Sequence, residues 1–238
     1  MIALSGGAQG YALASNSGKD GRPRRRPGKA PAAPQKKRPG HSNSVRIIGG
    51  EWRGRRIRFP SAAELRPTPD RVRETLFNWL QGVIGDARCL DLFAGSGALG
   101  LEALSRGARE VVFVERDARV AAALRETIAT FGGGRDQLIT ADAFRYLAGA
   151  PRPFDVVFLD PPFAQGRLAE LCTLLEFGGW LAPRAFVYLE GAARDGIPPL
   201  PAPWETARET RAGEVHCVLA RRADAATRAV GGEQMDET

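Results

Sequence analysis

Histidine and cysteine are scarce in this chain of 238 residues, and their scarcity excludes several kinds of chemistry. The two histidines, His41 and His216, are too few for a histidine-based catalytic triad or a histidine metal cluster. The three cysteines, Cys89, Cys172 and Cys217, lack C-x-x-C spacing and lie among apolar residues. We therefore expect no bound metal, and we expect buried thiols in a reducing compartment.

Long apolar runs are also lacking. No stretch reaches the roughly 20 residues that a membrane-spanning helix needs, and no apolar signal core follows a basic start at the amino terminus. These absences predict a cytoplasmic protein without membrane contact. The length allows one α/β domain of ordinary size with appendages.

Basic charge is abundant but unevenly distributed. The net charge is +7, yet residues 1–44 hold nine basic residues against one acidic residue, so the other 194 residues total −1. Because this segment is rich in Pro, Gly, Ala and Ser, we expect a disordered basic tail over 1–44, either an electrostatic tether for RNA or an extension without a role. We expect a second disordered tail over 223–238, which leaves 45–222 as the folded domain.

The tetrapeptide Asp160-Pro161-Pro162-Phe163 directly follows the apolar run 154–159, which predicts a buried strand. Two consecutive prolines fix φ twice and remove two backbone donors, so the loop after the strand should be stiff. A carboxylate, a fixed carbonyl and an aromatic ring in such a loop can hold a planar nucleobase amine. On its own, however, such a tetrapeptide is more often a simple turn after a strand.

A strand-turn-helix pattern lies upstream, between Cys89 and about Ser105. Its glycines fit G-x-G-x-x-G, which is typical of a nucleotide-type ligand site but also of a purely structural turn. The acidic residue at the strand tip suits a ligand with a cationic ammonium group better than a pyrophosphate. The candidate cofactor residues here are Asp91, Phe93, Ala94, Gly95, Ser96 and Gly97.

Two further strands are followed by acidic residues. The strand 110–114 ends in Glu115, twenty residues after Gly95, where a carboxylate can reach ribose hydroxyls; Arg116 is counted with it. The strand 137–140 is followed by Asp142-Ala143, and Asp142 could accept from an adenine amine, cap the helix 143–147, or do both. Since ligands bind at the carboxyl edge of open α/β sheets, these acidic residues mark one site.

The extension 45–66 precedes the main sheet and is rich in arginine. Its sequence VRIIGGEWRGRRIRF predicts two short strands around Gly49-Gly50, hence an N-terminal β-hairpin. Arginines interleaved with aromatic residues are typical of a surface that binds phosphates and stacks on bases, although a solvated edge would look similar. The candidate RNA contacts are Arg46, Trp52, Arg53, Arg55, Arg56, Arg66 and Arg71.

The remaining elements complete an α/β pattern. Thr68 is expected to cap a helix that begins at Pro69 and presents Val72, Leu76, Trp79 and Leu80 to the core. Further along, the sequence predicts a helix over 168–177, a strand over 185–190, and an antiparallel pair over 204–210 and 214–221 that turns at Ala212-Gly213.

From about Val45 to Arg221 the chain closely resembles the bacterial 16S ribosomal RNA (guanine(966)-N2)-methyltransferases, which use S-adenosylmethionine. The resemblance rests on RIIGGEWRGR (46–55), LRPTPDRVRETLFNWL (65–80), the stretch 89–107, DPPF (160–163) and GWLA (179–182). It implies a Rossmann-like class I methyltransferase fold, a mostly parallel seven-stranded sheet that ends in an antiparallel pair. It also implies methylation of the guanine N2 amine in 16S ribosomal RNA. The sequence leaves naked RNA and a small-subunit assembly intermediate open as substrates, and we expect the intermediate. We also expect a monomer.

The resemblance also implies residue roles. It assigns Asp91, Gly95 and Gly97 to the methionine end of S-adenosylmethionine, Glu115 to the ribose, and Asp142 with Ala143 to the adenine. It assigns Asp160 and Pro161 to the target amine and Phe163 to stacking on a flipped guanine. Many amine-methylating relatives carry Asn in place of Asp160, whereas the guanine-N2 family carries Asp.

Other functions share parts of this pattern. Methylation of adenine N6 in DNA or of a protein glutamine amide uses a similar proline-containing loop. A nicotinamide-dependent dehydrogenase would use the glycine turn but not the tetrapeptide. A catalytically silent RNA-binding module would use the arginines but not the acidic residues along the sheet edge.

Overall fold

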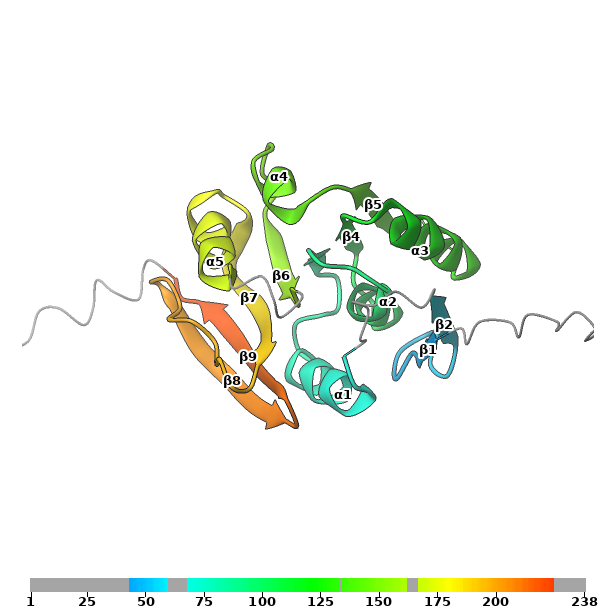
Figure 1. The fold of residues 1–238 in the computed structure, drawn as a ribbon, viewed down its shortest axis with the longest axis horizontal. Coiled ribbons are helices and arrows are strands. Elements are labelled where there is room, and N and C mark those ends of the chain that lie inside the picture. Colours follow the sequence, from blue (N-terminus) through cyan, green and yellow to red (C-terminus); the bar gives the residue numbers. More distant parts are fainter. Residues whose placement is uncertain (1–42, 60–67, 133, 162–166, 225–238) are drawn as a thin grey trace, which may run out of the picture. The chain divides into compact units, whose positions relative to one another are not determined.

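The computed structural model describes residues 43–59, 68–132, 134–161 and 167–224 (Figure 1). In these parts of the chain, an antiparallel pair, β1 (Asn43–Arg46) and β2 (Arg56–Phe59), precedes a seven-stranded sheet. The predicted N-terminal hairpin is confirmed, and it begins at Asn43, inside the segment expected to be a tail. The rest of that tail, residues 1–42, and the segment 225–238 lie outside the described residues.

The large sheet has the strand order β5-β4-β3-β6-β7-β9-β8. Five neighbouring strands run parallel, and β9 runs antiparallel between β7 and β8. The strands are β3 (Arg88–Asp91), β4 (Glu110–Glu115), β5 (Asp136–Thr140), β6 (Phe154–Leu159), β7 (Leu181–Ala192), β8 (Trp204–Ala212) and β9 (Val215–Arg222). This confirms the predicted fold. The strand order reverses at β3, so the carboxyl ends of β4, β3 and β6 form the edge where ligands bind in such sheets.

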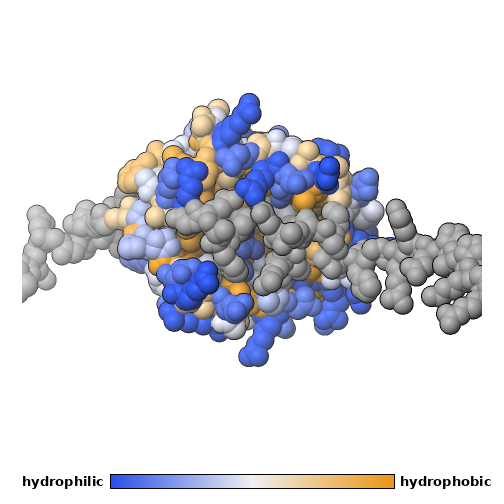
Figure 2. Space-filling view, viewed as in Figure 1, coloured by the Kyte–Doolittle hydropathy of each residue, from blue (hydrophilic) through white to orange (hydrophobic). Residues whose placement is uncertain are grey.

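Helices cover both faces of the sheet. They are α1 (Asp70–Trp79), α2 (Ala98–Ser105), α3 (Ala118–Thr130), α4 (Ala143–Leu147) and α5 (Leu168–Phe177). Alternate residues of the strands point to opposite faces. Accordingly Cys89 and Val111 pack in one hydrophobic cluster with α1, α2, α3 and the hairpin, whereas Leu90 and Val112 pack in another with α4 and α5 (Figure 1). On the face shown in Figure 2, hydrophilic residues surround smaller hydrophobic areas.

Several elements differ from the sequence expectations. Thr68 was expected to cap α1, but the cap position is Pro69 and the Thr68 hydroxyl points to other partners. Strand β7 extends beyond the expected 185–190 at both ends, because it pairs with β6 on one side and β9 on the other. No helix was anticipated over α3, which Asp117 caps by accepting from two backbone amides. None of the helices in the described parts of the chain has the length and apolar character needed to cross a membrane.

Candidate active site

The glycine turn joins β3 to α2 and leaves no room for side chains at two positions. Gly97 precedes α2 with φ of 76°, and a Cβ there would lie 2.4 Å from Leu124 Cδ1. A Cβ on Gly100 would lie 2.2 Å from the Phe113 ring, so α2 packs directly on β4. Glycine at these positions therefore permits both the turn and the close approach of α2 to the sheet.

Glu115 links the end of β4 to this turn. Its Oε2 accepts a hydrogen bond from the Gly95 backbone N–H at 2.9 Å, and its Oε1 accepts from the Asp117 N–H at 2.8 Å. These two bonds orient the carboxylate beside the glycine turn. The acidic residue and the glycine, twenty positions apart in the sequence, are thus in direct contact.

Asp91 lies at the end of β3 and is almost fully buried, with 2% of its surface exposed. Its Oδ2 accepts from the Gly100 N–H at 3.0 Å. Burial raises the pKa of this carboxyl to about 7, the Gly100 bond opposes that shift, and the charge of Glu115 adds to it. A cationic group placed beside Asp91 would favour the ionised carboxylate, so the site suits an ammonium-bearing ligand.

Asp142 caps α4, as predicted. Its Oδ1 accepts from the backbone N–H groups of Phe144 and Arg145 at 2.9 and 3.3 Å. The residue is exposed, and Ala143 beside it is buried. Contact of these two residues with an adenine stays a prediction, as does a cofactor role for the exposed Arg116. In the turn itself, Ala94 and Ser96 are buried and Phe93 is half-buried.

Asp160 follows β6 and meets two residues that the sequence did not single out for this site. The Thr68 hydroxyl lies 3.2 Å from Asp160 Oδ2 and 3.3 Å from Glu190 Oε2. Glu190 lies near the carboxyl end of β7 and is 4% exposed. The signal that could have identified Glu190 is the one used for the other strands, an acidic residue at the carboxyl end of a parallel strand.

The two carboxyls perturb each other. Burial, and then the charge of Glu190, raise the pKa of Asp160 well above its usual value. Burial also raises the pKa of Glu190, against hydrogen bonds from Tyr188 and Thr68 that favour its ionised form. Pro161 is half-buried beside Asp160, while Pro162 and Phe163 lie outside the described residues.

The N-terminal hairpin is attached to α2 by buried polar contacts. Glu102, fully buried, accepts from the backbone N–H groups of Ile48 and Gly49 at 2.7 and 2.8 Å. Ser105 donates to the Gly49 carbonyl at 2.6 Å and accepts from the Trp52 N–H at 2.9 Å. The hairpin is therefore held on the helix that starts at the glycine turn.

The candidate RNA contacts are not equivalent. Arg53 and Arg71 are exposed. Three further arginines are exposed but contact neighbours: Arg46 pairs with Asp70 at 3.9 Å, Arg55 lies 4.0 Å over the Phe131 ring, and Arg56 donates to the Ser44 hydroxyl at 3.1 Å.

Trp52 is 7% exposed, and its ring packs on Phe131 at 4.9 Å between centroids. Trp52 therefore has a packing role in place of the base-stacking role expected. Arg66 lies outside the described residues.

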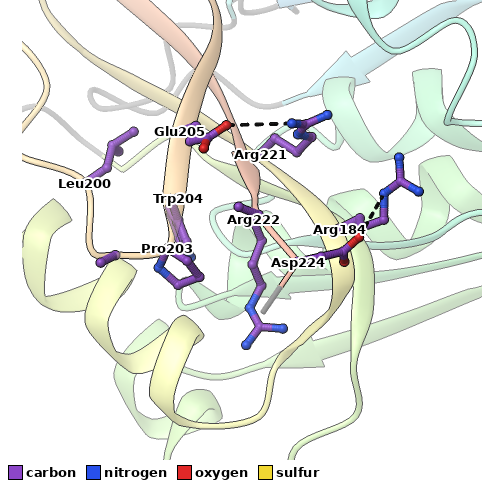
Figure 3. Close-up of a pocket in the computed structure, with 10 residues that line it drawn as sticks. Arg184, Leu200, Pro203, Trp204, Glu205, Arg221, Arg222 and Asp224 are labelled. Carbon is purple, nitrogen blue, oxygen red and sulfur yellow. Dashed lines mark ion pairs between the residues drawn. The ribbon is translucent and has the colours of Figure 1, made fainter. Parts of the chain in front are cut away.

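A pocket of about 560 Å³ lies elsewhere, at the end of the sheet where β7 and β8 begin (Figure 3). Its arginines are paired with acidic residues. Arg184 contacts Asp224 at 3.7 Å and Arg221 contacts Glu205 at 3.6 Å. Arg222 contacts Glu176 at 2.8 Å. Because it lies where β7 and β8 begin, the pocket is remote from the carboxyl edge of the sheet and from the residues described above.

The three cysteines are free thiols and buried, as expected. Within the described ranges, no three or more His, Cys, Asp or Glu side chains are grouped so that they could hold a metal ion.

The donor set at the sheet edge fits a ligand with a cationic group, a diol and an amine. The buried Asp91 carboxyl could pair with the cation, the oriented Glu115 carboxylate could bind the diol, and the exposed Asp142 carboxylate could accept from the amine. S-adenosylmethionine carries all three groups. A target amine bound next to it in such a site would face Asp160.

Comparison with known proteins gives consistent matches. The family described as "Conserved hypothetical protein 95" matches residues 45–221. The curated "Ribosomal RNA small subunit methyltransferase D" of Escherichia coli K12 is 50% identical over 188 residues, 78% of this chain and 95% of that protein. The protein of the same name in Haemophilus influenzae is 42% identical over 181 residues, 74% of this chain and 93% of its own length. A solved structure, "Putative methyltransferase yhhF from Escherichia coli", has a TM-score of 0.72 and 48% identity, covering 76% of this chain and 99% of that one.

Proposed function

The chain belongs to the family described as "Conserved hypothetical protein 95", the bacterial 16S ribosomal RNA (guanine(966)-N2)-methyltransferases, and on that premise we propose its reaction. It transfers a methyl group from S-adenosylmethionine to the exocyclic N2 of guanine 966 in 16S ribosomal RNA. Its substrate is a partly assembled small ribosomal subunit in the cytoplasm, and it acts as a monomer.

One observation carries the proposal. Strands β3 and β6 are parallel neighbours, with Asp91 in register with Phe158, so the residues that follow both strands reach the same edge. Asp160 therefore lies next to the strand whose tip carries Asp91 and the glycine turn. This geometry supports our proposal that the amine-binding loop lies beside the site for the methyl donor.

The bound S-adenosylmethionine supplies an electrophilic methyl group on a sulfonium sulfur. The guanine N2 lone pair is delocalised into the ring, so the protein must orient it. We propose that the Asp160 carboxyl and the Pro161 carbonyl each accept a hydrogen bond from the amine, and that these two bonds aim the lone pair at the methyl group. Positioning of this kind can lower a barrier by roughly 7–11 kcal/mol.

The base must first leave its stack, which costs a few kcal/mol and less for an unpaired base. We assign stacking on the extruded base to Phe163, with Pro162 fixing the loop. The exposed arginines of the hairpin and α1, namely Arg53, Arg56 and Arg71, would bind RNA phosphates, with Arg46 and Arg55 beside them and Arg66 following in the chain. Because Glu102 and Ser105 attach the hairpin to α2, these contacts would be held at a fixed position relative to the methyl donor.

A direct test uses two RNAs that differ only at the target base. One carries guanosine and the other carries inosine, which lacks the N2 amine. Labelled methyl from S-adenosylmethionine should enter the guanosine RNA as N2-methylguanosine and should not enter the inosine RNA. Equal labelling of both RNAs, or N6-methyladenine in duplex DNA offered in parallel, would overturn the substrate assignment.

A further inference from the structure

Asp160 does not stand alone at the end of β6. Glu190 lies beside it, and the Thr68 hydroxyl is within hydrogen-bond distance of both, at 3.2 Å from Asp160 Oδ2 and 3.3 Å from Glu190 Oε2. Thr68 and Glu190 are each 4% exposed. A hydroxyl has one hydrogen, so Thr68 can donate to one carboxyl while it accepts from the other.

The groups around this pair come from β3, β7, β9 and the segment just before α1. Asp91 faces Asp160 from β3, and Thr68 lies just before α1. Tyr188 of β7 donates to Glu190 Oε2 at 2.8 Å, and its hydroxyl lies 3.1 Å from Sγ of Cys217 on β9. Within the described residues, neither Asp160 nor Glu190 forms an ion pair with a basic side chain.

Glu190 is buried and Asp160 is half-buried, and no cation pairs with either carboxyl in the described parts of the chain. Two such carboxyls cannot both ionise at low cost, so they keep one proton between them near neutral pH. Two hydroxyls, Tyr188 and Thr68, favour the charge on Glu190, whereas among the described residues only the Thr68 hydroxyl contacts Asp160. The remaining proton therefore resides mainly on Asp160. Asp160 Oδ2 can then donate to Thr68, which in turn donates to Glu190.

We propose that Glu190 is a positioning residue for the methylation reaction. Linked to Asp160 through Thr68, Glu190 accepts a proton when the methylated amine releases one to Asp160. This inference rests on the function proposed above. It makes Asp160 the group that contacts the amine and Glu190 the group that ends the proton path.

The N2 lone pair forms the new N–C bond while the S–C bond breaks and its electron pair stays on sulfur. The nitrogen, now cationic, releases one proton to Asp160 Oδ1. Asp160 Oδ2 passes its own proton to the Thr68 oxygen, and the Thr68 hydrogen moves to Glu190 Oε2. The pair thus changes from one negative charge to none, and no other reactant is needed.

The first readout is the pH profile of single-turnover methylation at saturating S-adenosylmethionine. In the wild type, the fall in rate at low pH (the acid limb of the profile) should follow the ionisation of Glu190, the carboxyl that the two hydroxyls make more acidic. In Glu190→Gln, Asp160 must ionise on its own, so the limb should move to higher pH by about one unit. The matched control, Glu205→Gln, removes an exposed carboxylate of β8 outside the cluster and should leave the limb in place.

The link through Thr68 has its own test. Thr68→Val keeps the side-chain shape but removes the hydroxyl, so it should move the limb in the same direction although Glu190 is present. Thr68→Ser should restore the wild-type profile. If Thr68→Val lowers the rate equally at all pH values without moving the limb, Thr68 has a structural role only.

The second readout needs no turnover. The 13C-carboxyl signal of Asp160, identified by its loss in Asp160→Asn, should titrate at lower pH in Glu190→Gln, by about one unit or more, because the neighbouring charge is gone. The midpoint pH of the acid limb and the midpoint pH of the Asp160 titration should therefore differ in the wild type and coincide in Glu190→Gln. If they already coincide in the wild type, Asp160 acts without Glu190 and the inference fails. The proposed function fails separately, if the wild type makes no N2-methylguanosine.

Discussion

Replacing Glu115 with alanine should weaken S-adenosylmethionine binding strongly while leaving RNA binding unchanged. The carboxylate is oriented by the Gly95 and Asp117 backbone amides, and we assign the two ribose hydroxyls of the ligand to it. A hydrogen bond to a charged group contributes roughly 1.5–3 kcal/mol. Two such bonds at the lower value give about 3 kcal/mol, which corresponds to a roughly 100-fold rise in Kd.

Titration calorimetry with S-adenosylmethionine measures this change directly. Thermal unfolding without ligand shows whether the variant is folded, since Gly95 also loses an acceptor in Glu115→Ala. The matched control is Glu126→Ala, which removes an exposed carboxylate from α3 and should bind the ligand as the wild type does. A folded Glu115→Ala protein with a Kd within about threefold of the wild type would show that Glu115 does not hold the ribose.

Three further predictions concern pH, packing and RNA. Because the pKa of Asp91 is raised to about 7 and the cationic ligand favours the ionised carboxylate, S-adenosylmethionine affinity should rise about eightfold from pH 6 to 7.5, and calorimetry on Asp91→Asn should show no such rise. Gly100→Ala would place a Cβ 2.2 Å from the Phe113 ring and should lower Tm by roughly 3–10 °C, whereas Gly82→Ala, with open space around it, should leave Tm within about 1 °C. Arg53→Ala should reduce the slope of log affinity for RNA against log salt concentration by about 0.7, and an unchanged slope would remove Arg53 from the RNA surface.

Local patterns predicted most of the fold. The apolar run 154–159 is β6, the predicted helix 168–177 is α5, and the turn with Gly97 leads into α2. These elements depend on neighbours in the chain, which a sequence displays directly.

The contacts that the sequence did not predict join distant residues. Thr68 and Glu190 are 122 positions apart, and Ile48 and Glu102 are 54 apart, so no local pattern could pair them. The same holds for Trp52, whose position among arginines favoured a surface role but whose ring packs on Phe131 of the main domain. Residues that hold the site together are therefore less visible in the sequence than residues that contact the ligand.

The most direct test of the account is the identification of the methylated base in 16S ribosomal RNA. Labelled S-adenosylmethionine is offered to free 16S RNA, to small subunits that lack the modification, and to duplex DNA, and the products are digested and analysed by mass spectrometry. We predict N2-methylguanosine at position 966 alone, with small subunits as the preferred substrate. Label at another base, in DNA, or in no nucleic acid would contradict it.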